Sequence, residues 1–168
     1  MVAGGLAIGG LEKPIAALAS HGRDEERGVV LAFETMVGVS GPFVGSANPQ
    51  RGLNGGGLPW TIAQAEGRLN AGGELKVRVQ GLVLANTNDV PAALRGTNPV
   101  PAFRAVVSCL TIDAMGRIAT ANRATVPFPA TTGGDAEIEA TLALPKPCFA
   151  PIIFVTSPTL SWFAVTGM

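Results

Sequence analysis

Two glutamates have the spacing that comes nearest to a catalytic pattern. Glu137 and Glu139 stand two residues apart in the alternating segment AEIEATLAL. In a strand they would share one face about 7 Å apart, at about 3.3 Å per residue. Paired carboxylates about 5–10 Å apart serve glycoside hydrolysis. The same alternation describes the solvated face of a half-buried strand, which we favour, so a hydrolase is the least favoured function.

The two cysteines are the next candidates. Cys109 lies inside the apolar run AFRAVVSCLTID, and Cys148 begins another apolar run. They allow one disulfide, worth about 3–4 kcal/mol for a loop of this length; the alternative is two buried, reduced thiols. We favour the disulfide. A nucleophilic cysteine would need a base, and the single histidine, His21, lies in the charged segment HGRDEERG near the N-terminus.

No other motif predicts catalysis or a bound metal. His21 has no second histidine with which to share a metal. Asn86, Asn88 and Asp89 carry oxygen ligands of the kind that Ca²⁺ binds, but too few of them. The chain lacks GxSxG, HExxH, CxxC and P-loop patterns. We therefore predict a protein that is not an enzyme, with no catalytic residue, no metal and no cofactor.

Two long loops rich in glycine and proline, residues 38–59 and 86–101, are candidates for a binding surface. Irregular loops on a rigid sandwich commonly carry recognition. The residues that could contact a ligand or glycan are Phe43, Arg51, Trp60, Asp89 and Arg95. Alternatively, the first loop lies across the end of a sandwich, anchored by Phe43 and Leu53, and Trp60 packs in the core.

Composition predicts an all-β chain. The 168 residues suit one domain and include 22 Gly, 13 Pro and no Tyr, with many short Val, Ile, Leu and Thr runs. The charged fraction is 14%, below the roughly 25% of typical soluble domains, so either much of the chain is buried or other copies cover part of its surface. A net charge of zero attracts neither nucleic acid nor an anionic membrane, and we predict neither as a partner.

The apolar patterning predicts a single-domain antiparallel β-sandwich of about eight strands over residues 29–168. Residues 102–113 form its central strand, and the more polar residues 118–126 form a strand at an edge. The expected strands cover residues 29–37, 60–69, 74–85, 102–113, 118–126, 136–144, 152–155 and 160–165.

Residues 60–85 predict a hairpin whose register can be argued from charge. A loop of three residues, with Gly72 in the left-handed conformation, would place Arg68 opposite Glu74 and Glu66 opposite Lys76. A longer loop would set Arg68 against Lys76, a pair of like charges. We therefore predict the first register.

Residues 1–28 have two interpretations. The apolar start ends in Ala17-Leu18-Ala19, which resembles a cleavage site for an export signal. However, no basic residue precedes the apolar part, and Glu12-Lys13-Pro14 interrupts it. The segment is too short and broken for a membrane span. It is either a degenerate export signal or an ordered arm that packs on a neighbouring subunit.

Five segments resemble a group of uncharacterised small bacterial proteins, many with export signals. They are GGGLPW (55–60), NPVPAFRAVVSC (98–109), GDAEIEA (134–140), PCFAPIIFVTSP (147–158) and WFAVTG (162–167). The resemblance implies secretion and a disulfide, and it carries over no activity or ligand.

The sequence thus favours a non-enzymatic structural protein, extracellular or at the cell surface, that associates with itself. It could be a subunit of a surface assembly or filament, a homo-oligomer joined through its N-terminal arm. The alternative is a module that binds a ligand or glycan through the loops 38–59 and 86–101.

Overall fold

A computed structural model describes residues 28–167. The predicted arm or export signal lies outside the described residues except for Gly28, and so does His21. The described chain consists of β-strands and two short 3-10 turns, η1 and η2. The elements are β1 (Val29–Phe33), β2 (Val37–Gly38), η1 (Gly41–Phe43), β3 (Trp60–Thr61), β4 (Gln64–Asn70), β5 (Glu74–Gln80), β6 (Val83–Leu84), η2 (Ala92–Leu94), β7 (Ala102–Ile112), β8 (Ile118–Ala124), β9 (Phe128–Pro129), β10 (Ala136–Thr141), β11 (Phe149–Thr156) and β12 (Trp162–Val165).

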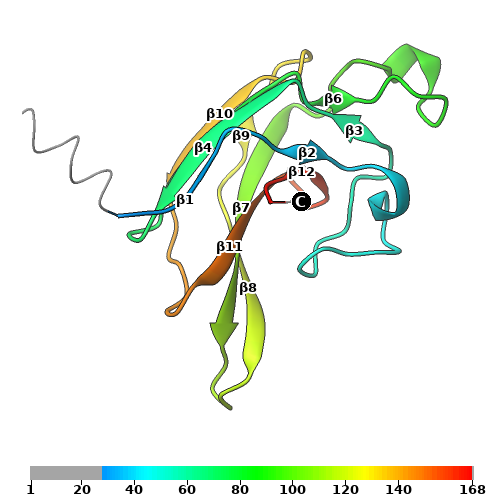
Figure 1. Cartoon of the computed structure of the whole chain (residues 1–168). Coiled ribbons are helices and arrows are strands. Elements are labelled where there is room, and N and C mark those ends of the chain that lie inside the picture. Colours follow the sequence, from blue (N-terminus) through cyan, green and yellow to red (C-terminus); the bar gives the residue numbers. More distant parts are fainter. Residues whose placement is uncertain (1–27, 168) are drawn as a thin grey trace, which may run out of the picture.

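The strands form two main antiparallel sheets in a sandwich-like arrangement (Figure 1). One sheet has the order β1-β4-β5-β10. The other has the order β2-β12-β11-β7-β8, with β9 paired to one end of β7. Apolar side chains of both sheets fill the space between them, among them Leu75, Ile138, Phe103 and Ile153. The all-β fold is as predicted, although the strands are more numerous than expected, and β11 is longer than the predicted strand 152–155.

The segment 29–37 is two strands and not the single strand expected. β1 belongs to the first sheet, and β2 belongs to the second. The chain leaves the first sheet after Phe33, and Met36 is buried between the two strands. A β-carbon at Gly38 would collide with the carbonyl of Trp60, so glycine permits the close approach of β2 to β3.

The hairpin of residues 60–85 bends in the middle. β4 pairs with β5, and beyond the bend β3 pairs with β6. The bend falls at Gly81, whose φ is 64°, a left-handed conformation that glycine adopts without steric cost. Each predicted strand is therefore split into a long part and a short part.

The predicted register of this hairpin is wrong. Arg68 lies opposite Lys76 and Glu66 lies opposite Arg78, so neither Arg68 and Glu74 nor Glu66 and Lys76 are paired. The charge argument considered only two strands. The third strand, β10, supplies the acidic partners of the basic residues on β5, which removes the reason to avoid the observed register.

The turn is shifted by one residue from the predicted one. Residues 71–73 connect β4 to β5, and Gly73, not Gly72, is left-handed, with a φ of 86°. Across the turn, the side-chain oxygen of Asn70 accepts a hydrogen bond of 3.0 Å from the backbone N–H of Glu74. This register also places Leu69 opposite Leu75, both in the core.

β7 is the central strand, as predicted. It pairs with β11 on one side and with β8 and β9 on the other. From Phe103 to Cys109 it is largely buried, and from Leu110 onward its exposure rises. Within residues 28–167, β8 has a strand neighbour on one side only, which makes it the predicted edge strand.

Candidate functional site

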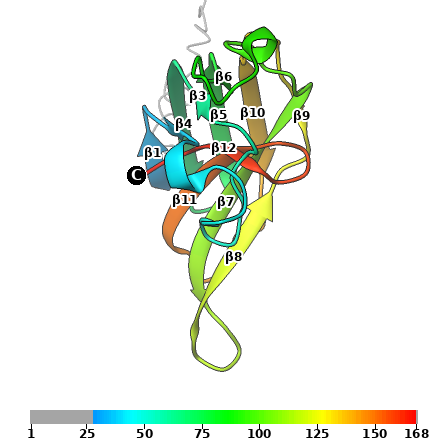
Figure 2. The same ribbon diagram turned by 90° about the vertical axis from the view of Figure 1, so that its right-hand side faces the viewer.

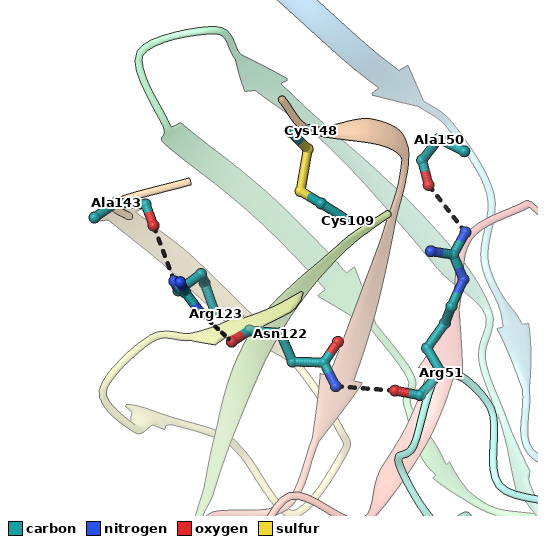
Figure 3. The surroundings of a disulfide bond; sticks show 7 residues. All are labelled: Arg51, Cys109, Asn122, Arg123, Ala143, Cys148 and Ala150. Atoms are coloured by element: carbon teal, nitrogen blue, oxygen red, sulfur yellow. Dashed lines mark hydrogen bonds between the residues drawn. A yellow bond between two sulfur atoms is a disulfide. The ribbon is translucent and has the colours of Figure 1, made fainter. Parts of the chain in front are cut away.

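The predicted disulfide joins Cys109 of β7 to Cys148, the residue before β11 (Figure 3). The two Cα atoms are 5.0 Å apart and 39 residues apart in sequence, within the range that a disulfide spans. Cys109 is fully buried. The bond fastens the middle of β7 to the start of its neighbour, at the point where the β7–β8 hairpin leaves the core.

A series of hydrogen bonds surrounds the disulfide (Figure 3). The guanidinium of Arg123 donates to the carbonyls of Ala143 and Asn122, both at 3.1 Å. The side-chain amide of Asn122 donates to the carbonyl of Arg51 at 2.9 Å, and Arg51 donates to the carbonyl of Ala150 at 3.1 Å. These bonds tie β8 to the segment after β10 and to the loop 38–59, and they tie that loop to the start of β11.

Both residues of the last bond have left-handed backbones. The φ angle is 49° at Arg51 and 40° at Ala150. For residues with a β-carbon this conformation costs on the order of 1–3 kcal/mol and persists only where the surroundings impose it. The side-chain bonds of Arg51 and Asn122 and the adjacent disulfide supply constraints of this kind.

The β7–β8 hairpin projects away from the two sheets in both views (Figures 1 and 2). Its turn is closed by Asp113, whose side-chain oxygen Oδ1 accepts hydrogen bonds of 2.9 Å from the N–H groups of Met115 and Arg117. Arg117 also forms an ion pair of 3.0 Å with Oδ2. The hydrogen bond from the Arg117 backbone, with those of Met115 and the Arg117 side chain, lowers the pKa of Asp113 below its ordinary value of 3.8.

The tip of this hairpin is apolar. Ile112 and Ile118 lie directly opposite each other, and they expose 50% and 79% of their surface. Met115, within the turn, exposes 78%. Large apolar side chains exposed together on a projecting element are typical of a contact with another molecule. Sequence reasoning missed this tip, although two isoleucines flanking a turn that contains methionine were a signal for it.

The outer edge of β8 has no neighbouring strand in the described chain, and one of its outward groups, the carbonyl of Asn122, accepts a hydrogen bond from the Arg123 side chain at 3.1 Å. Thr125 donates its N–H to the carbonyl of Ala105, and Asp113 donates to the carbonyl of Arg117. Backbone groups alternate sides along an antiparallel strand, so the odd-numbered residues of β8 bond to β7. The even-numbered residues turn their N–H and C=O groups outward, where no strand of the described chain lies. The outward-facing residues are Ile118, Thr120, Asn122 and Ala124.

The loop 38–59 lies against the β2–β8 sheet. Backbone hydrogen bonds of 2.8–2.9 Å join its Val39, Asn54 and Gly56 to β12. Leu53 is buried and Phe43 is partly buried against the core. These residues anchor the loop, and the guanidinium of Arg51 is directed into the structure toward Ala150.

Trp60 belongs to the core. Its ring stacks on Phe163 with 3.8 Å between ring centroids, and Phe103 meets both rings edge-on. Its surface is 5% exposed, so neither face of the indole is open to a sugar. Trp162 is buried as well.

The remaining loop candidates, Asp89 and Arg95, lie in the loop 86–101, which is at the top of both views (Figures 1 and 2). Arg95 bonds within its own loop, to the carbonyl of Val90 at 2.9 Å and to the side-chain oxygen of Asn88 at 3.5 Å. Asp89 is exposed. Asp89 and Arg95 thus share one loop, and Phe43 and Arg51 lie in the other, 38–59.

Glu137 and Glu139 share the outer face of the first sheet, as predicted. Glu137 pairs with Arg78 and Glu139 pairs with Lys76, both at 3.5 Å. The two glutamate side chains are 74% and 68% exposed. This is the geometry of a solvated strand face, with each carboxylate beside a basic residue of β5.

Residues 28–167 contain no group of three or more histidine, cysteine or acidic side chains placed to hold a metal ion. No helix in that part of the chain is long and apolar enough to cross a membrane. Comparison of the chain with protein-family models, curated proteins and solved structures finds no match.

Proposed function

We propose that the chain is a non-enzymatic structural protein of the cell exterior that associates with itself. The apolar tip of the β7–β8 hairpin and the edge of β8, which has no strand beyond it in the described chain, support this function most strongly. Both features favour association, because exposed apolar groups and unpaired strand edges bind other surfaces of the same kind. The disulfide and hydrogen bonds at the hairpin base fasten the start of this projecting element to the neighbouring segments.

The disulfide supports a location outside the cytosol. Disulfides form and persist in oxidising compartments and are rare where glutathione keeps thiols reduced. The zero net charge favours association further, because two copies experience no long-range repulsion.

Sedimentation equilibrium of the full chain over a range of concentrations tests the self-association. We expect a mass above the 17.1 kDa of one chain, rising with concentration. A single mass of 17.1 kDa at every concentration would overturn the proposal. A chain lacking residues 1–28 separates the contribution of the N-terminal segment, because an arm that joins subunits would lower the mass when removed.

The location is tested in the cells that make the protein. Denaturation followed by a thiol-reactive polymer leaves the protein unshifted on a gel if both cysteines are oxidised, and shifts it only after reduction. Labelling before reduction would count against an exterior location.

A further inference from the structure

We infer that β8 pairs antiparallel with β8 of a second copy about a two-fold axis at Ala121. This inference rests on the proposed self-association and names the surface that carries it. Such a pair would join the two β2–β8 sheets into one continuous sheet across the dimer, the arrangement in which an edge strand gains backbone partners.

The first argument is the hydrogen-bonding pattern of the edge. When β8 is laid antiparallel to itself around Ala121, Ile118 falls opposite Ala124 of the second copy, and Thr120 falls opposite Asn122 of the second copy. All four outward-facing residues then meet outward-facing residues, as a hydrogen-bonded ladder requires. The carbonyl of Asn122 already accepts from the Arg123 side chain at 3.1 Å, and its second lone pair is left for Thr120 of the second copy. A shift of two residues in either direction leaves one of the four without a partner.

The second argument comes from the side chains. Ala121 would face Ala121 of the second copy in a non-hydrogen-bonded pair, where Cα atoms approach to about 4.5 Å and a small side chain fits. Arg123, the only charged residue of β8, would face Ala119 of the second copy. No like charges are set against each other, and β8 contains no lysine or proline of the kind that protects edge strands.

The third argument is independent of the backbone. Ile118 and Val126, near the two ends of β8, expose 79% and 67% of their surface. Antiparallel pairing brings Ile118 diagonally next to Val126 of the second copy, within reach of side-chain contact. The two-fold axis makes this contact twice. In a parallel arrangement, Ile118 of one copy and Val126 of the other would lie at opposite ends of the pair and would not meet.

A proline at the edge tests the pairing directly. Thr120→Pro removes an outward N–H and leaves the bonds to β7 intact, because residue 120 does not donate to β7. In the full chain we expect the dimer dissociation constant to rise about 100-fold, since the symmetric interface loses the bond twice. Ala114→Pro is the matched control: it lies at the second position of the Asp113–Gly116 turn, which accepts proline, and it should leave the constant unchanged.

A charge pair tests the register. Ile118→Lys and Val126→Glu, both at exposed positions, should each weaken the dimer about tenfold. Together they should restore it, because the lysine of one copy meets the glutamate of the other. If the double variant is weaker than either single variant, the antiparallel register is wrong.

Hydrogen exchange gives a readout that needs no variant. The amide of Asn122 points outward and should exchange slowly only at concentrations where the dimer forms. The amide of Ala121 bonds to β7 and should be slow at every concentration, which makes it an internal reference for folding.

The outcomes separate this inference from the function on which it rests. If the full chain is a monomer, both are overturned. A different result would be that the full chain associates, that Thr120→Pro associates equally and that the Asn122 amide exchanges fast. In that case self-association stands, and the β8 edge is excluded as its interface. Near-ultraviolet circular dichroism and an intact disulfide establish that each variant has folded.

Discussion

Arg68 lies directly across from Lys76 in the β4–β5 hairpin, and Glu139 lies on the other side of Lys76 in β10. The like charges are tolerated because the three residues form one row in which the acidic side chain bonds to the middle basic one at 3.5 Å. The balance of charge is therefore a property of three strands, not of the hairpin.

Reversing the charge of Glu139, the acidic residue of this row, should destabilise the fold. Glu139→Lys places three basic side chains in line, and we expect the free energy of unfolding to fall by about 0.5–1 kcal/mol at low salt. The loss should shrink at high salt because the charges are exposed and screened. Urea unfolding at two ionic strengths measures it. Asp89→Lys, the same charge change in an exposed loop, is the control, and equal losses in both variants would contradict the explanation.

The disulfide should contribute a large share of the stability. Replacing both cysteines, as in Cys109→Ala with Cys148→Ala, should lower the free energy of unfolding by about 3–4 kcal/mol, the chain-entropy value for a loop of this length. Guanidinium unfolding of the oxidised protein, the reduced protein and the double variant measures the effect. We expect the last two to agree closely, and an unchanged unfolding midpoint in both would exclude this role.

The turn of the projecting hairpin should depend on pH. Hydrogen bonds from Arg117 and Met115 lower the pKa of Asp113 below its ordinary value of 3.8, so the folded state favours the charged carboxylate. The stabilisation is present above that ordinary value and is lost as the pH falls through the lowered pKa. The protection of the Met115 and Arg117 amides, measured relative to their intrinsic exchange rates at each pH, should fall as the carboxyl becomes protonated. In Asp113→Asn this acid-dependent loss of protection should disappear, and a pKa at or above 3.8 in a carbon-detected titration would refute the argument.

Two glycines in similar conformations should respond differently to alanine. Gly73 and Gly116 have φ angles of 86° and 77°, so alanine strains either backbone by about 1–2 kcal/mol. A β-carbon at Gly73 would also collide with the carbonyl of Leu142, whereas at Gly116 it meets open space. Urea unfolding should therefore show a clearly larger loss for Gly73→Ala than for Gly116→Ala. Equal losses of stability in the two variants would mean that the backbone near Leu142 shifts to make room for the β-carbon at residue 73.

Patterning along single strands was enough to predict much of the fold. The continuous apolar run of β7 indicated a strand buried on both faces, and the alternation of β10 indicated one wet face, because side chains alternate at period two. The polar character of residues 118–126 placed β8 at an edge. These features depend on one strand and its burial, so the sequence carries them locally.

Features that involve several strands could not be predicted in this way. The hairpin register depends on Glu139, more than 60 residues away in sequence from Lys76. The division of residues 29–37 between two sheets depends on the approach of Gly38 to Trp60. The projecting tip was overlooked because the exposure of Ile112 and Ile118 follows from how far β7 extends beyond its neighbours.

The bond between Cys109 and Cys148 makes residues 109–148 a covalent ring, and the exposed turn of the projecting hairpin lies on that ring. A protease that cuts after Arg117 would yield two pieces, 1–117 and 118–168, with one cysteine in each. The pieces would migrate as one molecule until a reductant is added. A cut at this exposed turn would therefore leave the two pieces covalently joined under oxidising conditions and would separate them only on reduction.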